Sequence, residues 1–89
     1  MTHETSTSLP GAQVLARAKR FFGERIPHTA AFPEQEGPAF LVLRGQGGEE
    51  LTVAVAEQGR DTHVRASTLF FDQAIGRFFS TLPPAGEAA

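Results

Sequence analysis

The chain has 89 residues, a formal net charge of −2 and no cysteine. This length suits one small domain and leaves no room for separate catalytic and cofactor domains. The lack of cysteine excludes disulfides, thiolate metal sites and cysteine nucleophiles, and the mild negative charge argues against a dedicated nucleic-acid binder, which usually has a strong basic excess. Because so small a domain has a thin stability margin, we expect self-association to add to its packing.

Nothing in the sequence predicts a membrane segment. The longest apolar run, Ala39 to Leu43, has five residues, whereas a span needs about 20. The first eight residues lack the apolar region of a signal peptide, so we expect a cytoplasmic protein. Seven of the eight basic residues are arginine and asparagine is absent, which we interpret as the codon bias of a high-GC bacterial genome.

Two polar or proline-rich ends flank the expected domain. Residues 1–8 (MTHETSTS) are polar and are predicted to be a disordered N-terminal tail. Residues 83–89 (PPAGEAA) form a second tail. The sequence therefore predicts a single α+β domain over residues 9–82.

A helix is predicted at each end of this domain. The first runs from Pro10 or Gln13 to Phe22, with Ser8 as its N-cap and Gly23 as its C-cap. The second is marked by apolar residues at helical spacing, and Pro83 ends it. The apolar face of this second helix consists of Phe71, Ile75, Phe78, Phe79 and Leu82.

Three strands are predicted between the helices, at Ala39–Arg44, Leu51–Glu57 and Thr62–Leu69. Short glycine-containing turns join them, which implies antiparallel hairpins. Residues 29–32 are a candidate fourth strand, and residues 33–38 (PEQEGP) are interpreted as a turn. The expected fold class is α+β, a two-layer sandwich in the order helix, three or four antiparallel strands, helix.

Two helices cover only one face of such a sheet, and the second face is expected to be small and apolar. If the helices take Leu51, Val53 and Val55, then Thr52, Ala54 and Ala56 lie on the other face, together with one apolar pair of the first strand. An exposed apolar patch of several hundred Å² usually marks an interface or a ligand site. Alternatively, the segment 26–37 folds across it. The candidate apolar pocket or interface residues are Phe40, Leu41, Val42, Leu43, Phe71, Ile75, Phe78 and Phe79.

No residue pattern indicates catalysis, a cofactor or a metal. The three histidines, at positions 3, 28 and 63, lack the spacing of metal ligands. Asp61, His63 and Ser67 contain the residue types of a catalytic triad, but no nucleophile elbow surrounds the serine. The carboxylate pairs 34/36 and 49/50 lie beside glycine and proline in expected turns. The glycine-rich stretch 45–48 precedes a strand rather than the helix that a phosphate loop needs.

The first predicted helix has a basic face. Arg17, Lys19, Arg20 and Arg25 are its cationic residues, and they are the best candidates for contacts with nucleic acid or another anionic partner. Lys19 points in a different direction from Arg17 and Arg20, and Glu24 interrupts the patch. A solvated helix face is therefore the preferred interpretation.

The stretch from Glu50 to Leu82 resembles the end of a helix-grip domain of the START, Bet v1 or polyketide-cyclase type. The resemblance rests on the strands LTVAV (51–55) and THVRAS (62–67), followed by the amphipathic C-terminal helix. It implies a curved antiparallel sheet around that helix, with an apolar ligand between them. This chain would be a half-size version that needs a partner to complete the cavity.

The leading hypothesis from sequence is a non-enzymatic bacterial module that forms a homodimer and binds an apolar small ligand. A protein-interaction or regulatory adaptor without a small ligand is the first alternative. Nucleic-acid binding through the first helix is a less favoured one. A ligand binder should have an enclosed apolar pocket between sheet and C-terminal helix, whereas an adaptor should have a filled core and an exposed apolar patch.

Overall fold

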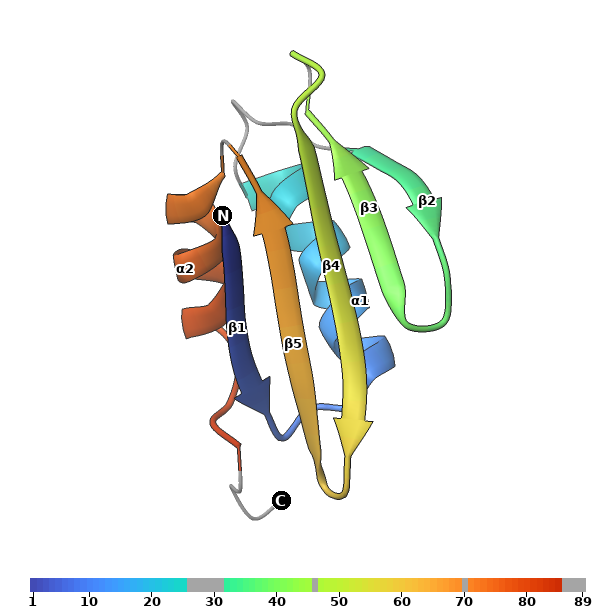
Figure 1. Cartoon of the computed structure of the whole chain (residues 1–89), viewed down its shortest axis with the longest axis vertical. Coiled ribbons are helices and arrows are strands. Elements are labelled where there is room, and N and C mark those ends of the chain that lie inside the picture. Colours follow the sequence, from blue (N-terminus) through green and yellow to red (C-terminus); the bar gives the residue numbers. More distant parts are fainter. Residues whose placement is uncertain (26–31, 46, 70, 86–89) are drawn as a thin grey trace.

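The computed structural model describes the chain except for residues 26–31, 46, 70 and 86–89. Five strands, two α-helices and one π-helical turn alternate along it (Figure 1). In chain order they are β1 (Thr2–Thr7), α1 (Gly11–Arg20), η1 (Phe21–Arg25), β2 (Phe32–Glu36), β3 (Phe40–Arg44), β4 (Glu50–Gln58), β5 (Asp61–Thr68) and α2 (Asp72–Ser80). The protein is an α+β fold, as its sequence predicts.

The strands form one antiparallel sheet in the order β1-β5-β4-β3-β2. Strands β3, β4 and β5 are joined by hairpins whose turns contain Gly48 and Gly59, both at positive φ, a conformation that glycine adopts without strain. The register aligns Phe40 with Ala54, and Ala54 with Arg65. Both helices lie behind the sheet in the view of Figure 1, with α1 behind β3 and β4 and α2 beside β1.

The core lies between the sheet and these helices. Leu51 and Val53 point into it from β4, and Val64 and Ala66 point into it from β5. Of the two orientations of the second predicted strand, the structure therefore has the one in which Leu51 and Val53 face the helices, and Val55 is only partly buried. The helices contribute fully buried side chains at helical spacing, namely Val14, Ala18 and Phe22 from α1 and η1, and Ile75 and Phe78 from α2.

The caps of α1 differ from expectation at both ends, since Gly23, the expected C-cap, lies inside η1 and Phe21 is the C-cap. The helix begins at Gly11 with Pro10 as N-cap and no side-chain cap, so the prediction that Ser8 caps it is wrong. The main-chain carbonyl of Pro10 instead accepts from Gln13 N and Val14 N. A Cβ on Gly11 would lie 2.9 Å from Val55 Cγ2, which explains why the smallest residue starts this helix.

The expected disordered tail at residues 1–8 is also wrong, because Thr2–Thr7 forms the edge strand β1. Its side chains are polar, so no apolar alternation marked it. Thr7 is nonetheless fully buried, and its Oγ1 donates to the carbonyl of Pro83 at 2.6 Å. Thr7 also forms a bridge with Pro84, so the first residues of the C-terminal tail contact β1.

The segment predicted as a turn at 33–38 is mostly strand. Phe32–Glu36 forms the other edge strand, β2, with a register shift between Pro33 and Gln35. Proline and a bulge are both tolerated at a sheet edge, where one side of the strand needs no partner. The turn itself is shorter and centres on Pro38. Residues 29–31 of the candidate fourth strand lie outside the described part of the chain.

Candidate functional site

The sheet face opposite the helices is the open face, and no described helix covers it. Side chains alternate along each strand, so the neighbours of the buried residues point to this side. Thr52, Ala54 and Ala56 on β4 therefore lie there. On β3 the structure resolves the two alternatives, because Leu41 and Leu43 are buried and Phe40 and Val42 are not.

An apolar strip runs over β3 and β4 on the open face. It consists of Phe40, Val42, Ala54 and Ala56. Phe40 is 38% exposed and directly opposite Ala54, and Val42 is opposite Thr52. The predicted interface residues thus divide into two groups, with Phe40 and Val42 in this strip.

The other predicted pocket residues lie on the helix side of the sheet. Leu41, Leu43, Ile75 and Phe78 are buried in the core. Phe71 and Phe79 are partly buried against it. The ring centroids of Phe78 and Phe22 are 5.5 Å apart, in a tilted arrangement. The space that the helix-grip resemblance assigns to a ligand is therefore occupied by side chains of the chain itself at these positions.

The open face also carries charge, so the expectation that it is uncharged is wrong. Arg44 donates to both carboxylate oxygens of Glu34, at 2.5 and 2.9 Å, and to Glu50 at 3.2 Å. The hydrogen bond from Arg44 holds the pKa of Glu34 below its usual range, and Glu34 raises the pKa of Arg44. On the other half of the face, His63 Nε2 lies 2.7 Å from Glu4 Oε1.

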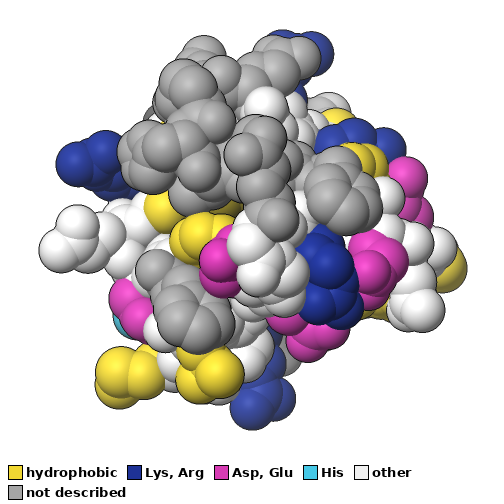
Figure 2. Space-filling model, turned by 90° about the horizontal axis from the view of Figure 1, so that it is seen from above, with side chains coloured by type: hydrophobic (Ala, Val, Ile, Leu, Met, Phe, Trp, Pro, Cys, Tyr) yellow, Lys and Arg dark blue, Asp and Glu magenta, His cyan; other side chains and the backbone are white. Residues whose placement is uncertain are grey.

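A hollow of about 500 Å³ opens at one corner of the open face, between the β3–β4 turn and the end of β5; we name it the Leu69 hollow. Met1 and Leu69 are 76% and 80% exposed there. In the view from this end, hydrophobic side chains project among charged ones (Figure 2). The sequence pattern does not predict this hollow, because Met1 lies in the segment expected to be a tail. The lining residues are Met1, Thr2, Gly48, Glu49, Glu50, Thr52, Ser67, Thr68 and Leu69.

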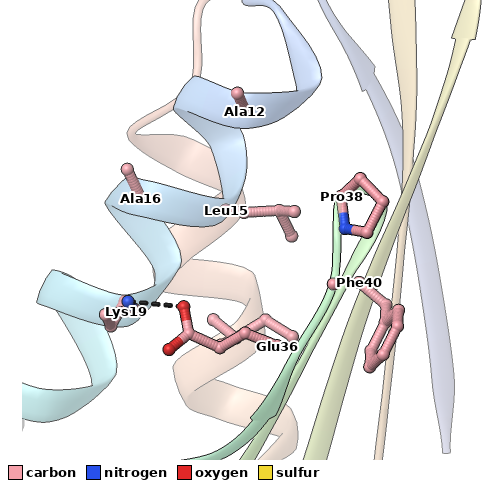
Figure 3. A pocket seen from close by; sticks show the side chains of 9 residues that line it. Ala12, Leu15, Ala16, Lys19, Glu36, Pro38 and Phe40 are labelled. Carbon is pink, nitrogen blue, oxygen red and sulfur yellow. Dashed lines mark ion pairs between the residues drawn. The ribbon is translucent and has the colours of Figure 1, made fainter.

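A second cleft, of about 240 Å³, lies between α1 and the β2–β3 hairpin (Figure 3). Leu15 points across it from α1, and the ring of Phe40 points away from the helix. Lys19 Nζ and Glu36 Oε1 form an ion pair across the cleft at 2.5 Å. Phe40 and Leu41 are both among the lining residues, so two of the predicted pocket residues border this cleft.

The basic residues of α1 border a third hollow, of about 310 Å³, beside the end of α2. It is lined by Arg17, Arg20, Phe21 and Thr81. Arg17 Nη1 donates to the carbonyl of Thr81 at 3.1 Å, so one guanidinium is fixed against the neighbouring helix. Neither arginine forms an ion pair within the described part of the chain. As predicted, Lys19 is directed elsewhere, towards Glu36.

The residues of the rejected triad do not assemble as one. His63 bonds Glu4, and Ser67 lies four residues further along the same strand, about 13 Å away. His3 bonds Asp72 at 2.6 Å, and His28 lies outside the described residues. In the described ranges, no three histidine, aspartate or glutamate side chains are grouped as metal ligands.

Compared with known proteins, the chain matches no family model, and it shows no significant similarity to a curated protein or to a solved structure. Neither described helix is long and apolar enough to cross a membrane. Any function must therefore be inferred from the surfaces described above.

Proposed function

We propose that the chain is a small non-enzymatic protein-interaction module that acts as a homodimer joined through the open face. The observation that carries this proposal is the contrast between the two faces of the sheet. The helix face is filled, since Leu41, Leu43, Ile75 and Phe78 are at most 1% exposed. The open face keeps an apolar strip in contact with solvent. A filled core with an exposed apolar patch is the arrangement expected of an adaptor.

The alternative of an apolar small ligand has less support. Such a ligand would contact Phe40 and Leu41 in the cleft of Figure 3. That cleft has a volume of about 240 Å³, whereas pockets for drug-sized ligands usually measure about 300–1,000 Å³ and enclose most of the ligand. An ion pair, Lys19–Glu36, also spans it. The Leu69 hollow is larger, about 500 Å³, but it is open at a corner of the sheet, beside Glu49 and Glu50, and does not enclose a ligand. A protein surface therefore fits the exposed apolar residues better.

The size of the open face supports a second copy as its partner. Five strands about 4.8 Å apart make a face about 24 Å wide, and strands averaging six to seven residues make it about 20 Å long. Burying this face on both copies would remove about 1,000 Å² from water, which is close to the minimum for a specific interface. Small domains also gain stability by this route.

The charges of the open face are compatible with a copy of itself. Three of its carboxylates have basic partners, because Glu4 pairs with His63, and Glu34 and Glu50 pair with Arg44. Two such faces would not repel one another, since each carries both signs of charge. Apolar groups and paired charges are also cheaper to desolvate than unpaired charges.

Light scattering at micromolar concentration tests the dimer, and a monomer mass near 9.6 kDa would refute it. Two neighbouring glutamate substitutions then locate the interface. Val42→Glu places a charge in the apolar strip and should give a folded monomer with an unchanged circular dichroism spectrum. Leu43→Glu places the same charge in the core and should unfold the chain. A Val42→Glu protein that remains dimeric would exclude the open face.

A second candidate function is supported by the hollow beside α1. Arg17 and Arg20 are exposed and without an ion pair to any described residue, and guanidinium groups suit phosphate and carboxylate oxygens. This favours an anionic partner such as nucleic acid on the helix side. Binding should then weaken steeply with added salt and be lost in an Arg17→Gln, Arg20→Gln variant, whereas Arg65→Gln on the open face serves as the control.

A further inference from the structure

We infer that Phe40 of each copy enters the Leu69 hollow of the other copy, about a two-fold axis that passes through Thr52; this inference rests on the proposed homodimer. Phe40 is the large apolar side chain of the apolar strip, and the hollow is the concave part of the same face. A two-fold interface is self-complementary, so a residue that contacts a site on the partner must receive the same contact in return. A projecting ring and a hollow on one face meet that requirement.

The two features lie at opposite ends of a diagonal of the sheet. Phe40 is at the start of β3, and Leu69 follows the end of β5, on the other side of β4 (Figure 1). The register aligns Phe40 with Arg65 through Ala54, and Leu69 is four residues beyond Arg65. The two positions are therefore separated by about 10 Å across the strands and about 13 Å along them.

The midpoint of this diagonal is a residue of β4. Thr52 lies one strand from β3 and one strand from β5, and it is two residues along β4 from Ala54, which marks the level of Phe40. In the dimer the open faces of the two copies are stacked, and the two-fold axis lies in the plane midway between them. If this axis passes over Thr52 at a right angle to the diagonal, it places Phe40 of one copy over Leu69 of the other. The strands of the two sheets then cross at about 70°, close to the orthogonal class of sheet packing.

The same axis brings small side chains together near the centre. It places Thr52 over Thr52 of the second copy, and Ala54 over Ser67 of the second copy. Small residues here allow the two sheets to approach to about 10 Å, the usual distance between packed sheets. Because each sheet is twisted, two crossed sheets diverge with distance from the axis. The larger side chains of Phe40 and Leu69 lie in this peripheral region and fill the wider gap.

The axis also gives Arg65 a partner. Arg65 forms no ion pair with any described residue, although it is directly opposite Glu4 in the register, because Glu4 bonds His63. In the dimer, Arg65 lies over β1 of the second copy, where Glu4 is the nearest carboxylate. An opposite charge beside the apolar contact would help to fix the orientation of the two copies.

The lining of the Leu69 hollow suits an aromatic ring. Met1 and Leu69 supply apolar contacts, and methionine is flexible enough to follow the shape of a partner. The short side chains of Thr52 and Ser67 form the bottom of the hollow. Its volume of about 500 Å³ admits a phenyl ring without movement of the main chain. Insertion would remove from water the exposed part of Phe40 as well as Met1 and Leu69, the two most exposed large apolar side chains of the described residues.

Cysteine cross-linking tests this arrangement, because the chain has no cysteine of its own. Cα atoms that face each other across sheets about 10 Å apart are too far apart for a disulfide. A short bismaleimide is therefore the suitable reagent. Thr52→Cys alone should give a cross-linked dimer. Ala54→Cys and Ser67→Cys should cross-link efficiently only when the two proteins are mixed and allowed to exchange. Ala16→Cys, exposed on α1, is the control and should not cross-link.

The outcomes separate this inference from the proposed function. A monomer in light scattering refutes both. A dimer that is lost in Val42→Glu but does not cross-link through Thr52→Cys keeps the open-face interface and overturns the two-fold axis inferred here. Cross-linking of Ala16→Cys as efficiently as Thr52→Cys would also overturn it, since the reagent would then report collisions.

A double-mutant cycle tests the contact between Phe40 and the hollow. Phe40→Ala and Leu69→Ala should each weaken the dimer by about tenfold, as expected for an apolar contact residue. Both side chains are exposed in a single copy, so neither change should unfold the monomer. If the two residues touch across the interface, the double variant should be weakened by clearly less than the product of the two effects. Independent effects would exclude the contact.

Discussion

His3 Nε2 lies 2.6 Å from Asp72 Oδ1, although the two residues are 69 positions apart in the chain. This pair connects the edge strand β1 to the first turn of α2. The N-terminal ammonium is also near, 3.6 Å from the same carboxylate oxygen. On the open face, His63 of β5 bonds Glu4 of β1. Histidine–carboxylate pairs therefore hold the polar strand β1 on both of its faces.

The first prediction concerns the titration of Asp72. The hydrogen bond from His3, followed by the charge of the N-terminus, holds the pKa of Asp72 below its usual range. Because the folded pKa is the lower one, this pair stabilises the fold fully above the pKa of Asp72 in the unfolded chain, and the stabilisation is lost as the pH falls through the folded value. In His3→Ala, the carbon-13 signal of the Asp72 carboxyl should titrate at higher pH. His63→Ala is the matched control and should leave that midpoint unchanged; equal shifts in both variants would contradict the assignment.

The second prediction concerns the buried hydroxyl of Thr7. Its Oγ1 donates to the carbonyl of Pro83 at 2.6 Å and accepts from Leu9 N at 3.3 Å. Thr7→Val keeps the shape and the strand propensity but leaves both main-chain groups without this partner. It should lower the free energy of unfolding by about 1–3 kcal/mol, measured by urea denaturation. Thr5→Val, at a partly buried position of the same strand, should change stability by much less, and an equal loss in both would contradict the argument.

The third prediction concerns the centre of the core. Phe78 is fully buried and lies against the rings of Phe21 and Phe22, with centroids 5.6 and 5.5 Å away. Phe78→Ala should cost about 3–5 kcal/mol, which can exceed the whole stability of so small a domain. Phe79→Ala, at a partly buried position of the same helix, should cost less. A near wild-type melting curve for Phe78→Ala would show that α2 does not pack as described.

The elements that were predicted correctly are those with an apolar pattern. Strands β4 and β5 alternate between buried and exposed residues, and both helices carry apolar residues at helical spacing, so burial alone determines their position. The bounds of β3, β4 and β5 differ from the predicted ones by at most one residue at each end. The pattern also separates the two faces of β4, Leu51, Val53 and Val55 against Thr52, Ala54 and Ala56, and the structure shows which of them the helices cover. On β3, where both faces are apolar, it left two alternatives, and only the tertiary structure distinguishes them.

The edge strands were missed for physical reasons. Strand β1 (THETST) has no apolar side chain, and its stabilising contacts with Asp72, His63 and Pro83 come from residues 59 to 76 positions away. Strand β2 contains a proline and a bulge, which sequence rules assign to turns. For β1, a usable signal was present, because threonine at positions 2, 5 and 7 favours strands. The Leu69 hollow could not be predicted, because it requires β1 to lie beside β5.

The fourth prediction concerns a glycine on the surface of α2. Gly76 lies inside the helix, and a Cβ added there would meet nothing within 4 Å. Gly76→Ala should therefore stabilise the protein by about 0.5–1 kcal/mol, because alanine loses less conformational entropy in a helix. Thermal unfolding measures the change. A loss of stability would mean that the space beside Gly76 is occupied in solution, for example by a partner.

The fifth prediction concerns Gly37, which lies against the ring of Phe40. A Cβ at Gly37 would overlap this ring, so Gly37→Ala must displace the side chain that we place in the Leu69 hollow. The ring is partly exposed and can move outward, so the free energy of unfolding of the monomer should change little. The dimer should dissociate at lower concentration than the wild type, which sedimentation velocity can measure. Gly76→Ala is the matched control, since it adds the same methyl group on the helix side and should leave dimerisation unchanged. A Gly37→Ala protein that dimerises as tightly as the wild type would show that the position of the Phe40 ring does not matter for association.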